Sequence, residues 1–325
     1  MICIQRESTD PYFNIAAEEY VFQNITEDVI MLWINDPCIV VGKHQNTLAE
    51  INIDFVSQNS IPVIRRISGG GTVYHDPGNL NYTFIRKGEK GSLIDYARHT
   101  RPIIDALREL GIEAKLEGKS DLTIAGRKFS GNAEHIYKDR VLHHGTLLFD
   151  TSLNLLEDSI RLKHQDYKDK GVKSIRSTVT NIKEHLGEPM SINDFRDFLI
   201  TFLSKSHPGL SIRPLKTEEK KEIQELADRK YKTWEWNFAY SPRYKLGRKL
   251  QTVKGILDIN LEIERGKINK VLLTGIERPT YFEVIEKSLL GVNHEEKSIR
   301  NKLNSINFDN SFHDLSIEDF IQGMF

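Results

Sequence analysis

Three consecutive glycines, Gly69 to Gly71, constrain the fold of this chain more than any other feature. Glycine loses more backbone freedom on folding than other residues, so a run of three lowers stability unless the structure needs it. The run lies between a β-branched stretch over 61–67 and a strand-like stretch over 72–74. Bare N–H groups in such a loop can hydrogen-bond the anionic oxygens of a ligand that approaches the backbone closely. A Gly-rich hairpin turn without a ligand is the alternative interpretation.

Two neighbouring features favour the anion-binding interpretation. Arg65 and Arg66 precede the loop, and an Asp-Pro-Gly-Asn corner follows it at 76–79. Arginine guanidiniums suit carboxylate and phosphate groups because their N–H donors form a planar fork. We therefore expect the loop to hold an anionic ligand.

Composition limits the class of protein. A chain of 325 residues is long enough for one large domain and a smaller one. With 39% hydrophobic and 28% charged residues it is expected to be soluble, and no apolar run approaches the ~20 residues of a membrane span. A net charge of −1 gives no overall basic field for nucleic acid. Only Cys3 and Cys38 are present and no signal peptide is evident, which favours the cytoplasm.

The hydrophobic pattern predicts an α+β fold, with a mixed or mostly antiparallel sheet flanked by helices. After the aromatic segment 234–242 we expect a boundary that divides the chain into 1–243 and a small α+β unit, 244–325. Asn14, Ser191 and Thr217 are predicted helix N-caps, Gly111 is a predicted C-cap, and Arg265-Gly266 is a predicted turn between two strands. The predicted helices are 14–24, 52–60, 93–110, 191–205 and 217–230, and the predicted strands are 29–34, 39–41, 61–67, 72–74, 80–85, 122–124, 127–130, 141–149, 257–263 and 268–274.

Several common nucleotide and catalytic motifs are absent from the sequence. There is no GxxxxGK[ST], no GxGxxG at a strand–helix junction and no GxSxG. There is also no CxxC and no HExxH, and the adjacent His143 and His144 would point to opposite faces of a strand, which suits a shared metal poorly. Any nucleotide must therefore be held in another way.

A predicted hairpin around Ala125-Gly126 carries the second informative element, Lys128. Period-2 alternation places Lys128 and Ser130 on one face and Phe129 on the other. If Phe129 is buried, the Lys128 ammonium faces the opposite surface, where a point charge could stabilise a phosphate oxygen or a developing oxyanion. An exposed strand lysine without a role is the alternative.

Lipoate–protein ligases, members of the biotin/lipoate ligase superfamily, carry a signature loop that resembles residues 65–85 of this chain, RRISGGGTVYHDPGNLNYTFI. The resemblance also covers 119–131, with Lys128, the segment His144-Gly145-Thr146 and the loop 170–181. It extends from Asp10 to the small C-terminal unit. The resemblance implies a catalytic domain over 1–243 and an accessory domain over 244–325.

The resemblance implies that ATP activates lipoate to lipoyl-AMP, which is then transferred to a lysine of an acceptor protein. The implied acceptors are the lipoyl domains of 2-oxoacid dehydrogenase complexes and the glycine cleavage H protein. Two anions meet in such a reaction, so the site needs backbone donors, fixed cations and Mg²⁺ on the pyrophosphate. The loop 170–181 would fold over the adenylate or help to dock the acceptor, unless it is only a solvated basic loop.

The resemblance also implies residue roles. Lys128 would contact the acyl carboxylate and the phosphate, and Asp121 would hold Mg²⁺ or merely form a turn. His75 would contact the adenylate or be a structural histidine bonded to the Asp76 turn, while Trp33 and Val40 would line an apolar tunnel or belong to the core. The implied ligand-binding set is Arg65, Arg66, Ser68, Gly69, Gly70, Gly71, Thr72, Tyr74, His75, Asp76, Asn79, His144 and Gly145.

Two other functions remain as alternatives. One is an ATP-independent lipoyl or octanoyl transferase with a cysteine nucleophile, but Cys3 and Cys38 both lie outside the implied catalytic segments. The other is a non-catalytic lipoate-binding protein, which would have no need of Lys128 to stabilise phosphoryl transfer. We therefore expect the ATP-dependent ligase.

Overall fold

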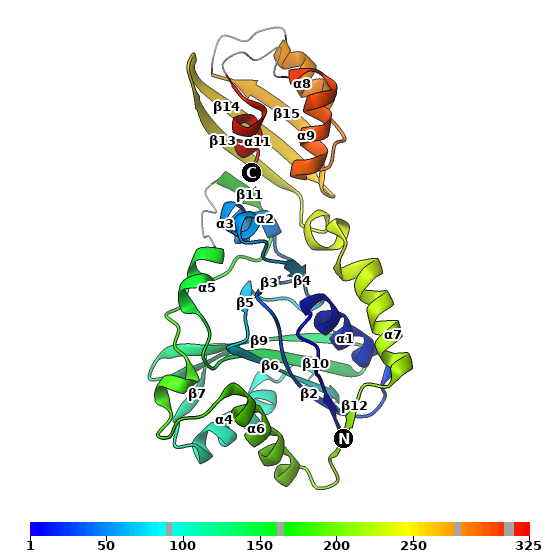
Figure 1. The fold of residues 1–325 in the computed structure, drawn as a ribbon, viewed down its shortest axis with the longest axis vertical. Coiled ribbons are helices and arrows are strands. Elements are labelled where there is room, and N and C mark those ends of the chain that lie inside the picture. The colour runs from blue at the N-terminus through cyan, green and yellow to red at the C-terminus, as the bar shows by residue number, and fades with distance from the viewer. Residues whose placement is uncertain (89–92, 161–165, 276–280, 309–314) are drawn as a thin grey trace. The chain divides into compact units, whose positions relative to one another are not determined.

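The computed structural model describes residues 1–88, 93–160, 166–275, 281–308 and 315–325 (Figure 1). The chain forms two compact units. The first comprises 1–43, 55–160 and 174–233, and the second comprises 44–54, the described part of 161–173, and 234–325. Two short segments from well before the predicted boundary at 243 thus belong to the second unit, which the sequence did not predict. The division of roles between 1–243 and 244–325 stays a prediction.

The first unit is built on an eight-stranded mixed sheet, which confirms the predicted fold class. The first three strands in spatial order are parallel to one another, and the remaining pairs of neighbouring strands are antiparallel. A separate small sheet has the order β4-β3-β5. In spatial order the large sheet consists of β12 (Ser211–Pro214), β1 (Ile2–Gln5), β2 (Val29–Ile34), β6 (Asn79–Lys87), β10 (Arg140–Leu148), β9 (Arg127–Tyr137), β8 (Asp121–Ile124) and β7 (Ala114–Glu117); the small one consists of β4 (Val63–Arg65), β3 (Cys38–Val41) and β5 (Val73–His75).

Strand alternation divides the large sheet into two differently covered faces. Leu80, Tyr82 and Phe84 of β6 pack in one apolar core with α4 (Tyr96–Glu109) and α6 (Ile192–Ser206). The intervening Thr83 points to the other face, where it donates to Glu18 of α1 (Pro11–Asn24). Helix α1 packs in turn on α7 (Thr217–Leu226). One face of the sheet is therefore an apolar core, and the other carries polar side chains.

Tight turns in both units form where the sequence predicted them. Ala125 and Gly126 both have positive φ, +49° and +74°, which suits the two-residue hairpin between β8 and β9. Arg265 and Gly266, at +51° and +71°, form the corresponding turn in the second unit. Gly111 follows α4 at φ +76°. These predictions are confirmed.

Two of the three predicted helix caps are wrong. Asp10 caps α1 through Oδ1, which accepts from the Tyr12 amide at 2.9 Å, while Asn14 is fully buried within the helix. Proline at the first helical position makes this earlier start favourable. Thr217 is the first residue of α7 rather than its cap. The Ser191 cap is confirmed, since its Oγ accepts from the Asp194 amide at 3.1 Å.

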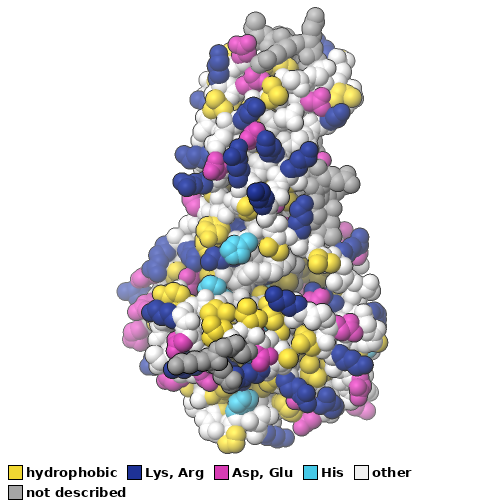
Figure 2. Space-filling view, turned by 180° about the vertical axis from the view of Figure 1, so that it is seen from behind, with side chains coloured by type: hydrophobic (Ala, Val, Ile, Leu, Met, Phe, Trp, Pro, Cys, Tyr) yellow, Lys and Arg dark blue, Asp and Glu magenta, His cyan; other side chains and the backbone are white. Residues whose placement is uncertain are grey.

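The second unit is a four-stranded sheet with helices on one face. The predicted alternation in β14 is confirmed, because Leu257, Ile259, Leu261 and Ile263 are all buried. Lys and Arg side chains gather on the surface of this unit in Figure 2. Lys245 of β13 is exposed. The elements are α2 (Thr47–Glu50), β11 (Tyr167–Asp169), β13 (Tyr244–Thr252), β14 (Gly255–Glu264), β15 (Lys267–Thr274), α8 (Tyr281–Leu289), α9 (Glu296–Ser305) and α11 (Ile317–Gln322), while α3 (Ile53–Gln58) spans the division between the units and α5 (Leu153–Ser159) belongs to the first.

Among the described residues, no helix has both the length and the apolar character that a membrane crossing requires.

Candidate functional site

The glycine loop joins the small-sheet strands β4 and β5, and its shape depends on close backbone contact. Gly70 has φ +89°, a conformation that L-residues rarely adopt. Gly42 lies against it so tightly that a Cβ on Gly42 would be 2.2 Å from the Gly70 carbonyl oxygen. The Arg66 guanidinium donates to the carbonyls of Gly69 and Gly71, both at 2.7 Å. The backbone contact with Gly42 and the hydrogen bonds from Arg66 therefore hold the loop in one conformation.

Both arginines before the loop bind backbone carbonyls. Arg65 is fully buried and donates through Nη1 to Gly42 at 3.0 Å and Lys43 at 3.1 Å. Arg66 also donates through Nη1 to Val40 at 3.1 Å. Burial lowers the pKa of Arg66 to about 10, against the opposing effect of Glu18, so the group remains charged at neutral pH. In the structure both guanidiniums thus bind backbone carbonyls in and around the loop. Their predicted contact with a ligand stays a prediction.

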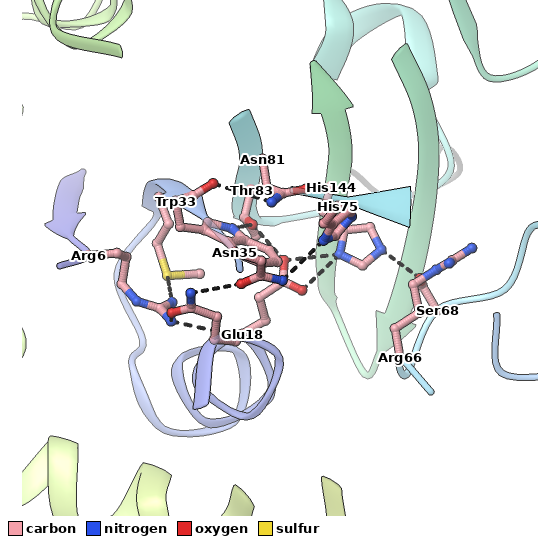
Figure 3. A network of polar contacts seen from close by, with 12 residues as sticks. Arg6, Glu18, Trp33, Asn35, Arg66, Ser68, His75, Asn81, Thr83 and His144 are labelled. Carbon is pink, nitrogen blue, oxygen red and sulfur yellow. Dashed lines mark hydrogen bonds and ion pairs between the residues drawn. The ribbon is translucent and has the colours of Figure 1, made fainter. Parts of the chain in front are cut away.

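A directional chain of hydrogen bonds anchors the loop to the sheet and to α1 (Figure 3). Trp33 Nε1 donates to Thr83 Oγ1 at 3.0 Å, and Thr83 donates to Glu18 at 2.6 Å. Glu18 accepts from His144 Nδ1 at 3.0 Å, which leaves His144 Nε2 as an acceptor. Ser68 Oγ lies 2.6 Å from that nitrogen and so donates to it. The sequence predicted His144 and Ser68, and the structure brings them together.

Arg66 completes this chain from the other end. Its Nε donates to Ser68 Oγ at 3.0 Å, so the Ser68 hydroxyl is fixed on both sides. Figure 3 shows Glu18, His144 and Ser68 in succession, with Arg66 beside Ser68. The orientation of the glycine loop is therefore coupled to a carboxylate on α1.

His75 is buried beside this chain as a neutral imidazole. Asn35 Nδ2 lies 3.1 Å from its Nδ1, which therefore accepts, and its ring meets the Trp33 ring edge to face. Burial lowers the pKa of His75 to about 3, with further lowering from Arg66 and His144. Its hydrogen-bond partner is thus Asn35, and not the Asp76 turn that one interpretation predicted.

The corner after the loop is held by Asp76. Its Oδ1 accepts from the Gly78 amide at 2.9 Å and its Oδ2 from the Ser152 amide at 2.8 Å. Asn79 is fully buried and donates to Asn81 Oδ1 at 3.0 Å. Within the described part of the chain, Asn79 Oδ1 and the Tyr74 hydroxyl are buried without a hydrogen-bond partner. Their predicted contact with a ligand stays a prediction.

Lys128 forms a second centre with Asp121. Its Nζ is 2.9 Å from Asp121 Oδ1, and the two side chains are 26% and 35% exposed. Phe129 is buried and Lys128 is partly exposed, as predicted, but a β-bulge interrupts the assumed alternation. Thr123 pairs with Lys128 while Leu122 pairs with Ser130, so Phe129 is the extra residue.

The segment 174–180 links the two centres. Ser174 Oγ accepts from the amide of Thr72, directly after the glycines, at 2.9 Å. Further along, the Lys128 amide donates to Thr178 at 2.9 Å, and the Thr180 amide donates to Lys128 at 3.0 Å. Part of the loop predicted to cover the adenylate therefore contacts both the glycine loop and the backbone of Lys128.

Other predicted residues are packed into the core. A Cβ on Gly145 would lie 2.0 Å from Asn132 Oδ1, so this glycine makes room for packing against β9. Trp33 and Val40 are 2% and 1% exposed, as core residues are. Whether either also lines a tunnel stays a prediction.

Glu18 and Asn35 were not predicted from the sequence, and Ser174 was predicted only as part of the loop 170–181. A signal for Glu18 was present, because Glu18-Glu19 interrupts an otherwise apolar helical stretch. Both carboxylates are nearly buried, and Glu19 accepts from the Tyr231 hydroxyl and from Lys230 at 2.7 Å. Two adjacent glutamates within an apolar helical stretch therefore indicate that buried polar groups bind their carboxylates.

Both cysteines are buried, at 2% and 0% exposed. Burial raises the pKa of Cys3 to about 11 and raises that of Cys38 further. Because the thiolate is the nucleophilic form, neither residue has the environment of a catalytic cysteine.

Two family models match the chain. Lipoyl protein ligase A/B catalytic domain matches residues 10–204, and Bacterial lipoate protein ligase C-terminus matches residues 241–324. Among curated proteins, lipoate-protein ligase LplJ of Bacillus subtilis is 36% identical over 96% of both chains. Lipoate–protein ligase 1 of Staphylococcus aureus is 35% identical over 97% of both chains.

Solved structures share the fold at low identity. Plasmodium falciparum LipL1 in complex with lipoate matches with a TM-score of 0.62 and 21% identity over 99% of both chains. A lipoate-protein ligase A bound with ATP matches with a TM-score of 0.60 and 24% identity, over 73% of this chain and 98% of that one. A bipartite lipoate protein ligase of Thermoplasma acidophilum, described with its E2 lipoyl domain, matches with a TM-score of 0.62 and 23% identity, over 73% and 95% of the two chains.

Proposed function

The chain belongs to the lipoate–protein ligase family, and from this premise we propose that it activates lipoate with ATP and transfers the lipoyl group to a lysine of an acceptor protein. In the first step a lipoate carboxylate oxygen attacks the α-phosphorus of ATP and pyrophosphate leaves. In the second step an acceptor amine attacks the acyl carbon of lipoyl-AMP, loses a proton and displaces AMP.

The observation that carries the proposal is the partly exposed Lys128 ammonium, joined through 174–180 to a rigid glycine loop. Two anions repel each other during adenylation, and a fixed ammonium lowers that repulsion at the phosphate oxygens. A Cβ on Gly131 would be 3.3 Å from Lys128 Nζ, so glycine there leaves space around the ammonium. We assign Lys128 the catalytic role and the loop amides the binding of substrate, and Tyr74 and Asn79 stay predicted ligand-binding residues.

Mg²⁺ would be held at Asp121. Magnesium in nucleotide sites uses one or two carboxylates together with substrate phosphates, and a partly exposed carboxylate beside Lys128 fits that donor set. The ion would neutralise charge on the departing pyrophosphate. The proposed acceptors are lipoyl domains of 2-oxoacid dehydrogenase complexes and the glycine cleavage H protein, and the proposed compartment is the cytoplasm.

Lipoate-dependent ATP–pyrophosphate exchange tests the proposal. We expect exchange by the wild-type chain and a loss on the order of 100-fold in Lys128→Ala, the usual effect of losing one preorganised electrostatic group. Lys115→Ala, an exposed lysine on β7 of the same sheet, is the matched control and should retain exchange. A folded wild-type protein without exchange would refute the ligase function, and acyl movement between carrier proteins without ATP would then support the transferase.

A further inference from the structure

A second histidine–carboxylate cluster lies on the opposite face of the large sheet from Ser68, His144 and Glu18. It consists of His99 on α4, Glu134 on β9 and His143, the neighbour of His144 on β10. The Nδ1 atoms of His99 and His143 lie 3.1 and 3.0 Å from the same oxygen, Glu134 Oε1. All three side chains are at least 95% buried. None of them takes part in the proposed ligase chemistry.

The hydrogen-bond directions place an unshared electron pair inside this cluster. Asn132 Nδ2 donates to Ser120 at 2.8 Å, so Asn132 Oδ1 is the acceptor for the Tyr82 hydroxyl. Having donated its proton, the Tyr82 oxygen faces His143 Nε2 at 3.4 Å as an acceptor. This arrangement favours the His143 proton on Nε2. The Nδ1 electron pair then points at the Glu134 carboxylate.

Two further oxygens lie near this cluster. Glu134 Oε2 is buried and has no hydrogen-bond partner among the described residues. The Asp95 carbonyl oxygen lies 2.9 Å from His99 Nδ1. One possible ligand atom from each of His99, Glu134 and His143 lies within 4.8 Å of the other two. Nitrogen and oxygen electron pairs converging in a buried space are the donor set of a divalent transition metal.

We propose that His99, Glu134 and His143 form a structural zinc site in which the Asp95 carbonyl supplies a further oxygen. Bonds of about 2.0 Å to a tetrahedral ion separate neighbouring ligand atoms by about 3.3 Å, close to the 3.0 and 3.1 Å seen here. The imidazoles bind as neutral ligands, each with its proton on Nε2, and Tyr82 accepts the one on His143. Burial leaves no open position for substrate, which distinguishes the site from a catalytic one.

The ion would join α4 to β9, the strand that carries Lys128, and to β10.

Zinc binding to the full chain tests the proposal. After chelation and dialysis, we expect Zn²⁺ alone to bind at one ion per chain. At 100 times its dissociation constant, zinc should raise the folded-to-unfolded ratio about 100-fold. Glu134→Gln and His143→Gln should abolish this stabilisation, while His44→Gln, an exposed histidine outside the cluster, should retain it.

Cobalt substitution tests the same site without a variant, in case these core substitutions prevent folding. Wild-type chain loaded with Co²⁺ should show the intense visible bands of a tetrahedral ion with nitrogen and oxygen ligands. Absence of such bands, or equal zinc stabilisation of wild type and Glu134→Gln, would overturn the proposal. Neither readout depends on ligase activity.

Discussion

Replacing Glu18 by glutamine should test the hydrogen-bond chain behind the glycine loop. Glu18 is 3% exposed and accepts from His144 and Thr83. Its charge also acts on two buried guanidiniums: burial lowers the pKa of both Arg6 and Arg66 to about 10, and the Glu18 charge opposes the shift in each. Glu18→Gln keeps the shape of the side chain but removes the negative charge.

The expected cost follows from that burial. Removing one partner of a buried charge network leaves the other charge uncompensated, which costs about 3–5 kcal/mol. For a unit of this size 1 kcal/mol shifts the melting temperature by roughly 2–4 °C, so the variant should melt about 6–20 °C lower. Because Arg66 holds the carbonyls of Gly69 and Gly71, pyrophosphate exchange should fall more than the folded fraction does.

Denaturant unfolding and exchange activity, measured on the same preparations, provide the assay. Glu7→Gln is the control, because Glu7 is 83% exposed and its pair with Lys220 spans 3.9 Å. Exposed pairs of this kind contribute about 0–1 kcal/mol. If Glu18→Gln unfolds within 1 kcal/mol of wild type, the charge on Glu18 does not stabilise the arginines and the reasoning is refuted.

Three further predictions concern the loop and its surroundings. Gly42→Ala would place a methyl group 2.2 Å from the Gly70 carbonyl oxygen, and it should lower stability by about 1–3 kcal/mol and abolish most exchange activity. Gly69→Ala is the control, because no atom lies within 4 Å of its new Cβ, and it should be tolerated. Equal melting temperatures of the two variants would contradict this prediction. The lowered pKa of His75, about 3, means that only the unfolded chain takes up its proton between pH 6.5 and 3. Stability should therefore decline as pH falls below 6.5, by about 1.4 kcal/mol per unit from this group, and His75→Gln should flatten denaturant-derived stability plotted against pH. Ser174→Ala removes one hydrogen bond to the loop, worth about 0.5–1.5 kcal/mol, and should raise the KM for ATP while lowering the melting temperature by only about 1–6 °C.

Local chemistry explains what the sequence could predict. The turns at 125–126 and 265–266 depend on two residues each, and the Ser191 cap depends on the next three. Alternation identified the buried face of β14 because every buried partner lies on one side of that strand. Such features need no knowledge of distant segments.

The errors and omissions arise from contacts between distant segments. Asn14 fits an N-cap by type, but Pro11 starts the helix earlier and Asn14 donates to Ile34, twenty residues away. The bulge at Phe129 depends on pairing with β8. Glu18 meets His144 only after α1 folds onto the sheet, 126 positions apart in sequence. A pattern within one segment carries no record of these partners.

Because both cysteines are buried, a single introduced cysteine could be labelled selectively for spectroscopy. With their thiols shielded and held in the protonated form, neither Cys3 nor Cys38 should react readily with maleimide dyes near neutral pH. Ile175 is 89% exposed and directly follows Ser174, which binds the amide after the glycines. A single Ile175→Cys substitution would therefore place a fluorophore beside the glycine loop without removing any native thiol. Its emission could then follow that segment in real time as ATP, lipoate and an acceptor are added in turn.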